Sequence, residues 1–198
     1  MPEQDAVLAI TGGLDDMQAV LDLVWEHLSP AMQAEPLAAD NRAHAVLVER
    51  LRSLTLCPPS GAATSPLAAQ VSGQTYHFDS NEPGITTIQL DFEGDGAHVR
   101  LRDAQGIHEF AVGYEKWKPG QTRFHGNPRQ QASERVAASG AWITEDSYTM
   151  RLSFIETPFI SMLTFRFAED RLEFDFCYNV NFGPLAWPRL GGKLNPSV

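Results

Sequence analysis

The chain has 198 residues and a formal net charge of −10, with 43% hydrophobic and 20% charged residues. This composition is typical of a globular protein and excludes disordered and fibrous classes. The negative charge repels phosphate groups and no run of Lys or Arg forms a basic stripe, so we expect no nucleic acid partner. Apolar stretches such as residues 19 to 25 are shorter than the roughly 20 residues that span a bilayer, so we expect no membrane span. Residues 1 to 6 show neither a basic nor an apolar signal region, which favours the cytoplasm.

The first predicted elements are a short strand and a helix. The apolar run from Val7 to Ile10 precedes a Thr-Gly-Gly turn, which is typical of a strand end. From Leu14 onward, apolar residues recur every three or four positions until Pro30. This spacing predicts an amphipathic helix that ends near Pro30.

A second helix is predicted from about Asp40 to Leu54, with Asp40 or Asn41 as its cap. Residues 55 to 70 are then rich in Pro, Ser, Gly and Ala, a composition typical of a linker. We therefore expect three parts: a strand with two helices at residues 1 to 54, a linker at 55 to 70, and a second domain at 71 to 198.

After the linker, the hydrophobic period changes from 3.6 to 2 residues. Apolar and polar residues alternate at 88 to 92, 148 to 154, 163 to 167 and 172 to 176, and short turn sequences follow each run. Sequential hairpins with one apolar face predict an up-and-down antiparallel β-barrel of about eight strands. The fold class is therefore mainly β, with two preceding helices; a two-sheet sandwich is the alternative.

No catalytic residues, cofactor or metal site can be recognised in the chain. It has no G-x-G-x-x-G, P-loop, H-E-x-x-H or C-x-x-C motif. Ser72 and Ser139, each beside a glycine, lie in strand-like surroundings and are interpreted as structural. The histidines do not show the i, i+2 or i, i+4 spacing of metal ligands; they are His27, His44, His77, His98, His108 and His125. An enzymatic site near Trp142, Arg151 and Glu156 is a weaker alternative.

Aromatic residues of the predicted barrel are the remaining candidates for a binding site. They are placed to line a small apolar pocket of the kind that ligand-carrying barrels enclose, or to form an ordinary packed core. The candidate interior residues are Tyr76, Phe78, Trp142, Tyr148, Phe154 and Phe165.

Two groups of segments resemble one protein family. Residues 8 to 13 (LAITGG), 16 to 21 (DMQAVL) and 25 to 28 (WEHL) resemble the last strand and C-terminal helix of serine β-lactamase and penicillin-binding-protein-like hydrolases. Residues 71 to 76 (VSGQTY), 138 to 142 (ASGAW) and 154 to 159 (FIETPF) are similar to the lipocalin-like C-terminal extension of some bacterial members. The family's Ser-x-x-Lys and Tyr-x-Asn motifs are absent, so no active-site residue can be transferred.

The resemblance implies a non-catalytic accessory barrel, here without the hydrolase catalytic domain that would be its partner. The alternative function is a free-standing carrier of a small apolar ligand. In the parent fold, the strand and first helix would pack on a sheet that this chain lacks. We therefore expect a homo-oligomer formed through the segment that begins at Val7 and ends at Leu28; docking of this segment against the chain's own barrel is the alternative.

Overall fold

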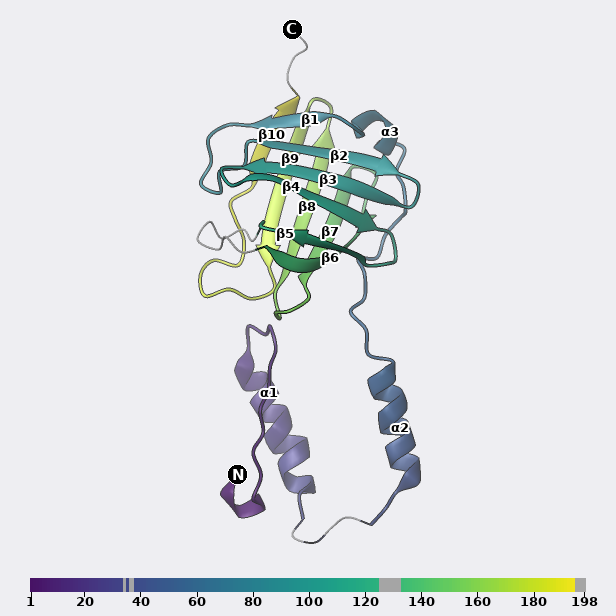
Figure 1. The fold of residues 1–198 in the computed structure, drawn as a ribbon, viewed down its shortest axis with the longest axis vertical. Coiled ribbons are helices and arrows are strands. Elements are labelled where there is room, and N and C mark those ends of the chain that lie inside the picture. The colour runs from purple at the N-terminus through teal and green to yellow at the C-terminus, as the bar shows by residue number, and fades with distance from the viewer. Residues whose placement is uncertain (34, 36–37, 125–132, 195–198) are drawn as a thin grey trace. The chain divides into compact units, whose positions relative to one another are not determined.

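The computed structural model describes residues 1–33, 35, 38–124 and 133–194 (Figure 1). The chain divides into two compact units, Met1–Cys57 and Pro58–Val198. We call them the helical unit and the barrel unit and describe each by itself.

The helical unit contains both predicted helices. Helix α1, Met17–Leu23, continues into a π-helical turn, Val24–Leu28, and a 3-10 turn, Ser29–Ala31. Helix α2 is Asn41–Arg52, and a short 3-10 turn, Pro2–Gln4, lies near the N-terminus. The Asp40 carboxylate accepts a hydrogen bond from the Ala43 backbone N–H at 2.9 Å, as expected of an N-cap. Asp16 caps α1 in the same way through the Ala19 N–H.

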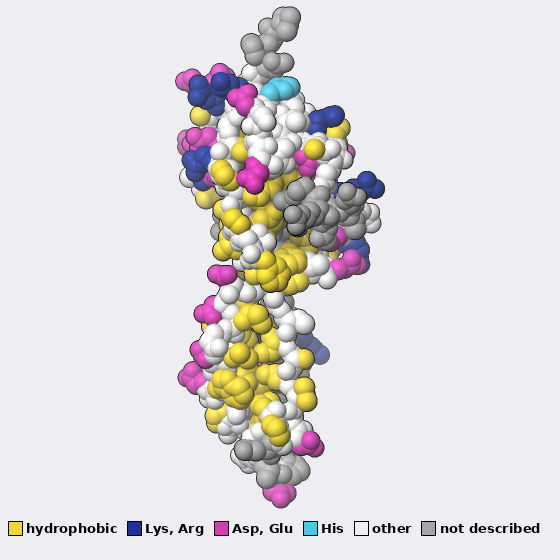
Figure 2. All heavy atoms as spheres, turned by 90° about the vertical axis from the view of Figure 1, so that its left-hand side faces the viewer, with side chains coloured by type: hydrophobic (Ala, Val, Ile, Leu, Met, Phe, Trp, Pro, Cys, Tyr) yellow, Lys and Arg dark blue, Asp and Glu magenta, His cyan; other side chains and the backbone are white. Residues whose placement is uncertain are grey.

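The predicted strand from Val7 to Ile10 is wrong. These residues have no regular secondary structure, and Val7 is 96% exposed. A strand requires a hydrogen-bonded neighbour, and the described part of this unit contains no other strand to pair with it. No described residue of α1, the π-helical turn or α2 is buried, and hydrophobic side chains form a broad patch on this unit (Figure 2). Self-association through this segment stays a prediction.

The described part of the barrel unit forms one sheet that closes into a barrel. The order of the ten strands is β4-β3-β2-β1-β10-β9-β8-β7-β6-β5, and neighbours in this order are antiparallel. Gly113 pairs in parallel with Ser139, which joins β4 to β6 and completes the ring. The strands are β1 Thr75–Phe78, β2 Thr87–Glu93, β3 Gly96–Asp103, β4 Gly106–Gly113, β5 Lys118–Thr122, β6 Glu134–Trp142, β7 Ser147–Phe154, β8 Ile160–Ala168, β9 Arg171–Tyr178 and β10 Leu190–Leu194.

The alternation seen in the sequence separates the inside of this barrel from its outside. Along β7 to β9, every second residue is buried, and Leu152, Leu163 and Phe174 have no exposed surface. The residues between them carry the charges of the outer face, such as Arg166 and Asp175. The predicted up-and-down antiparallel barrel is confirmed, and its described part has ten strands where about eight were expected.

The predicted linker is only partly a linker, because residues 58–71 lie on the barrel. Ala62 forms an antiparallel bridge with Trp142, and the Tyr114 hydroxyl donates to the Gly61 carbonyl at 3.1 Å. Helix α3, Ala68–Val71, follows and contacts β2 (Figure 1). We call residues 58–71 the strap. A Cβ atom on Gly61 would lie 2.3 Å from the Trp142 carbonyl oxygen, so the small residues that suggested a linker permit this close approach.

Candidate ligand-binding site inside the barrel

Four aromatic rings meet inside the barrel near the strap. Phe92 of β2 lies 4.8 Å from Trp142 of β6 and 5.1 Å from Tyr148 of β7, measured between ring centroids. The Trp142 and Tyr148 centroids are 5.5 Å apart, and Phe167 of β8 lies 5.7 Å from Trp142. Trp142 and Tyr148 are also direct cross-strand partners, which places both rings on the same inward face. We call Phe92, Trp142, Tyr148 and Phe167 the strap-end cluster.

Two polar atoms of the strap-end cluster are buried without a partner. Trp142 and Tyr148 are each 2% exposed, and the Trp142 Nε1 and the Tyr148 hydroxyl oxygen have no hydrogen-bond partner within the described part of the chain. Burial raises the pKa of Tyr148, so its hydroxyl keeps its proton and remains a donor at neutral pH. Buried polar groups in proteins are nearly always hydrogen-bonded, so two such atoms on touching rings are unusual.

The missing side chain of Gly140 makes room for the Tyr148 hydroxyl. A Cβ atom at Gly140 would lie 2.4 Å from this hydroxyl oxygen and 2.7 Å from the ring carbon that bears it. The hydroxyl therefore rests against the backbone of β6, two residues from Trp142 and on the same face of the strand. Any larger residue at this position would clash with the phenol.

Phe92 is the half-buried member of the strap-end cluster and forms its boundary. It ends the inward-facing series Ile88, Leu90, Phe92 of β2. Its backbone N–H donates to the Ser72 hydroxyl at 2.8 Å, just after the strap.

The structure brings most of the predicted interior residues together. Tyr76 lies 5.9 Å from Phe167, and Phe165 lies 6.5 Å from Tyr148, so both adjoin the strap-end cluster. Phe78 packs near Phe174. Phe154 is also buried, but it lies six residues from Tyr148 along β7, which is about 20 Å at the usual rise of a strand. Phe154 therefore belongs to a different part of the interior.

Phe92 and Phe167 were not predicted as site residues. Both occupy inward positions of runs whose alternation is visible in the sequence, at 88 to 92 and 163 to 167. The alternation of apolar and polar residues therefore predicted that both rings face inward, but it did not indicate which inward rings would meet across the barrel.

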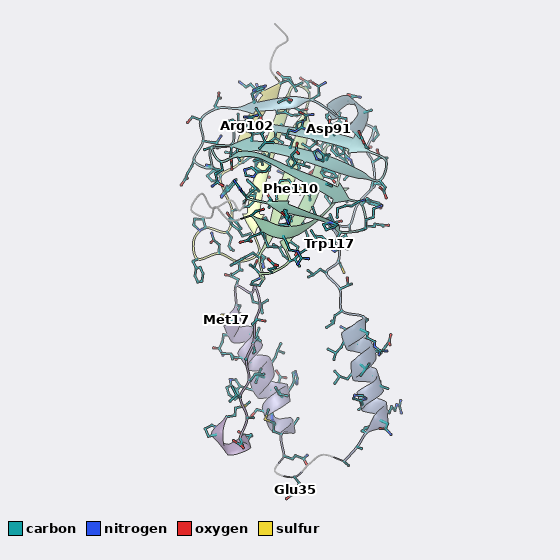
Figure 3. All side chains as sticks on the ribbon, in the orientation of Figure 1. Met17, Glu35, Asp91, Arg102, Phe110 and Trp117 are labelled. Carbon is teal, nitrogen blue, oxygen red and sulfur yellow. The ribbon has the colours of Figure 1, made fainter. Side chains whose placement is uncertain are left out.

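A second aromatic cluster lies farther along the barrel. Phe124 contacts Phe110 and Phe176, and Phe176 stacks on Trp187 with centroids 4.1 Å apart. Phe110 is labelled on β4 in Figure 3. Near this cluster, the buried His108 contacts the Phe124 ring, and its Nε2 lies 2.9 Å from the Asp103 carboxylate. The Ser161 hydroxyl of β8 is buried and has no partner among the residues described.

The alternative enzymatic site is not assembled. Trp142 faces the interior, whereas Glu156 is exposed and pairs with Arg135 at 3.5 Å. Arg151 alternates with the inward residues Met150 and Leu152 and so belongs to the outer face. Among the described residues, no three potential metal ligands gather at one place. His125 lies outside the described residues.

Ser72 and Ser139 hold parts of the barrel together. The buried Ser139 hydroxyl donates to the Gly113 carbonyl at 2.8 Å, next to the pairing that closes the barrel. Ser72 accepts the hydrogen bond from the Phe92 N–H. Both hydroxyls therefore have structural roles.

Comparisons with known proteins add little. No family model and no curated protein matches the chain. One solved structure with a similar fold is titled "REP1-NXSQ fatty acid transporter"; it is 9% identical, covers 65% of this chain and 99% of its own, and has a TM-score of 0.45. Within the part of the chain that the structure describes, no helix combines the length and apolar character needed to cross a membrane.

Proposed function

We propose that the barrel binds a small, largely apolar ligand that accepts a hydrogen bond from Trp142 or Tyr148. The observation that carries this proposal is the pair of buried, unpartnered polar atoms on two touching rings. An unsatisfied buried polar group costs about 1–3 kcal/mol. A ligand acceptor that reaches these atoms would recover that cost, whereas a purely structural core would be more stable with apolar rings there.

The half-buried Phe92 indicates how a ligand would reach the site. The Trp142 Nε1 and the Tyr148 hydroxyl are closed off from solvent, so a side chain must move before anything can contact them. Phe92 contacts both rings and lies at the end of β2 beside the strap. In our proposal, the ligand takes the place of the Phe92 ring and keeps its tilted contact with Trp142 and its edge-to-face contact with Tyr148.

This function suits a free-standing carrier. It is also compatible with an accessory domain, as the resemblance to serine hydrolase extensions implies, because neither role needs a nucleophile in the barrel. The proposal rests on the interior of the barrel and not on that resemblance.

The test uses the full chain carrying isotope-labelled tryptophan and follows the indole N–H resonances by NMR. The probes are ethylbenzene, acetophenone, benzoate and octanal, each titrated to millimolar concentration. The chain has four tryptophans, and the Trp142 resonance is identified by its loss in Trp142→Phe. We expect at least one probe to shift this resonance in a saturable manner and to leave that of the exposed Trp25 unchanged. If no probe produces a saturable shift, the proposed function is wrong.

A further inference from the structure

The polar atoms of the strap-end cluster call for a ligand with a hydrogen-bond acceptor. The indole N–H of Trp142 can only donate a hydrogen bond. The Tyr148 hydroxyl keeps its proton because burial raises its pKa, so it too offers a donor. An oxygen atom with two lone pairs can accept from both groups, and a carbonyl oxygen has this capacity.

The charges of the barrel make a neutral ligand more favourable than an anion. Charged side chains form ion pairs on the outer face, as Arg100 does with Glu109 and as Arg189 does with Asp175. Within the described residues, the buried polar side chains are serines, threonines and His108, and the His108 ring is bonded to the carboxylate of Asp103. A carboxylate moved into such an interior would lose its hydration and gain no cation in exchange. A neutral carbonyl group has a much smaller desolvation cost.

The rings of the strap-end cluster favour a flat ligand. Phe92 lies 4.8 Å from Trp142 with a tilt of 40° between the planes, and it meets Tyr148 and Phe167 edge-on. A ligand that replaces the Phe92 ring enters a space bounded by aromatic faces and edges, which an aromatic ring fills with the same contacts. The Tyr148 hydroxyl lies against the backbone of β6 at Gly140, at the wall of the barrel.

We propose that the ligand of this site is a neutral aromatic carbonyl compound, a ketone, aldehyde, ester or amide attached to a flat ring, whose carbonyl oxygen accepts hydrogen bonds from Trp142 and Tyr148. This inference rests on the proposed function and specifies the chemical class of its ligand. In this arrangement, the carbonyl oxygen of the ligand accepts from the two donors, and the aromatic ring of the ligand occupies the position of the Phe92 ring.

Three probes of similar size separate the contributions of the ring, the acceptor and the charge. Ethylbenzene has the ring alone, acetophenone adds a neutral carbonyl group, and benzoate adds a charged one. Dissociation constants are measured near neutral pH by calorimetry on the full chain. Acetophenone is expected to bind about tenfold more tightly than either other probe, which corresponds to about 1.4 kcal/mol of hydrogen bonding.

Tyr148→Phe is the decisive variant because it removes one donor and keeps the ring. It should weaken acetophenone binding several-fold and leave ethylbenzene binding unchanged. Tyr114→Phe is the matched control, since it removes the same atom from a hydroxyl that bonds to the Gly61 carbonyl of the strap. In this control, acetophenone should still bind more tightly than ethylbenzene and benzoate. Circular dichroism checks that both variants fold.

The possible outcomes distinguish this inference from the proposed function. Benzoate or ethylbenzene binding at the Trp142 resonance as tightly as acetophenone would overturn the neutral-carbonyl assignment and leave small-ligand binding in place. An equal loss of acetophenone affinity in both tyrosine variants would also overturn it. If octanal shifts the Trp142 resonance in a saturable manner and none of these three probes does, the inference fails and the function stands; if octanal also fails, neither stands.

Discussion

Replacing Tyr148 by Phe removes one oxygen atom, and we expect the barrel to become more stable. The hydroxyl is closed off from solvent and has no partner among the described residues, so folding removes it from water without compensation. Such a group costs about 1–3 kcal/mol. The ring contacts with Phe92, Trp142 and Phe165 do not depend on the oxygen. We therefore expect the free energy of unfolding to rise by about 1 kcal/mol, which raises Tm by about 3–5 °C in a unit of this size.

Urea unfolding of the full chain, followed by circular dichroism, measures this change. Tyr114→Phe is the control, because its hydroxyl donates to the Gly61 carbonyl at 3.1 Å, and removing a satisfied hydrogen bond should lower stability by about 1 kcal/mol. The two variants lose the same atom and should shift in opposite directions. If Tyr148→Phe is destabilised as much as Tyr114→Phe, the hydroxyl has a partner and the reasoning behind the proposed site fails.

Three further changes test the packing and the charges of the barrel. Gly140→Ala should lower the free energy of unfolding in urea by about 1–3 kcal/mol, because its Cβ would lie 2.4 Å from the Tyr148 hydroxyl. In a chain that also carries Tyr148→Phe, the same substitution should cost less. An equal cost of Gly140→Ala with and without the hydroxyl would contradict the clash. Leu152→Ala should cost about 2–5 kcal/mol, since the side chain is fully buried, and a loss below about 0.5 kcal/mol would be that of a surface site. Burial raises the pKa of Asp175, but hydrogen bonds from Arg189 and Arg166 lower it more, so the pKa lies below its ordinary value. The stability that these hydrogen bonds contribute is present above the unfolded pKa of about 3.9 and is lost as the pH falls through the folded pKa. Below about pH 4, the Tm of Asp175→Asn should therefore depend less on pH than the Tm of the unchanged chain. If both chains show the same dependence of Tm on pH, the contacts of Asp175 with Arg189 and Arg166 do not cause the loss of stability in acid.

Local patterns were sufficient to predict helices α1 and α2 and the strands β2, β7, β8 and β9. A cap such as Asp40 bonds to a backbone N–H three residues away, so both partners lie within one short stretch of sequence. The alternation in β7, β8 and β9 is equally local. The segment from Val7 to Ile10 shows the limit of this reasoning, because its apolar residues meet the local requirement for a strand but find no pairing partner in the described part of the helical unit.

Closure of the barrel depends on contacts that no local pattern contains. β1 pairs with β10, which brings Tyr76 opposite Leu194. β10 has the sequence LGGKL and β5 has KPGQT, and neither shows the apolar alternation of the other strands. These two strands form because neighbouring strands offer free backbone groups. The sequence therefore predicted the barrel class and left its full strand order open.

The candidate site combines predictable and unpredictable features. Aromatic residues on inward positions indicated that Trp142 and Tyr148 would be buried, and they are. Whether a buried donor finds an acceptor depends on every group around it in three dimensions, so the unpartnered state of these two atoms could not be deduced from residue types. The need for glycine at position 140 could not be predicted either. It follows from the position of the Tyr148 side chain against β6, which is a contact in three dimensions.

The two unpartnered donors and the half-buried Phe92 are consistent with a single purpose, which is to admit and bind a ligand from outside. If the interior served stability alone, Phe in place of Tyr148 would fill the same volume without an unsatisfied group. A donor kept inside at a cost to stability suits an acceptor that arrives from outside, and such an acceptor needs a route. The half-buried Phe92 is the one member of the strap-end cluster not fully enclosed, and its ring contacts both donor-bearing rings. Phe92→Ala should therefore speed ligand association at the Trp142 resonance, and an unchanged rate would place the route elsewhere in the barrel.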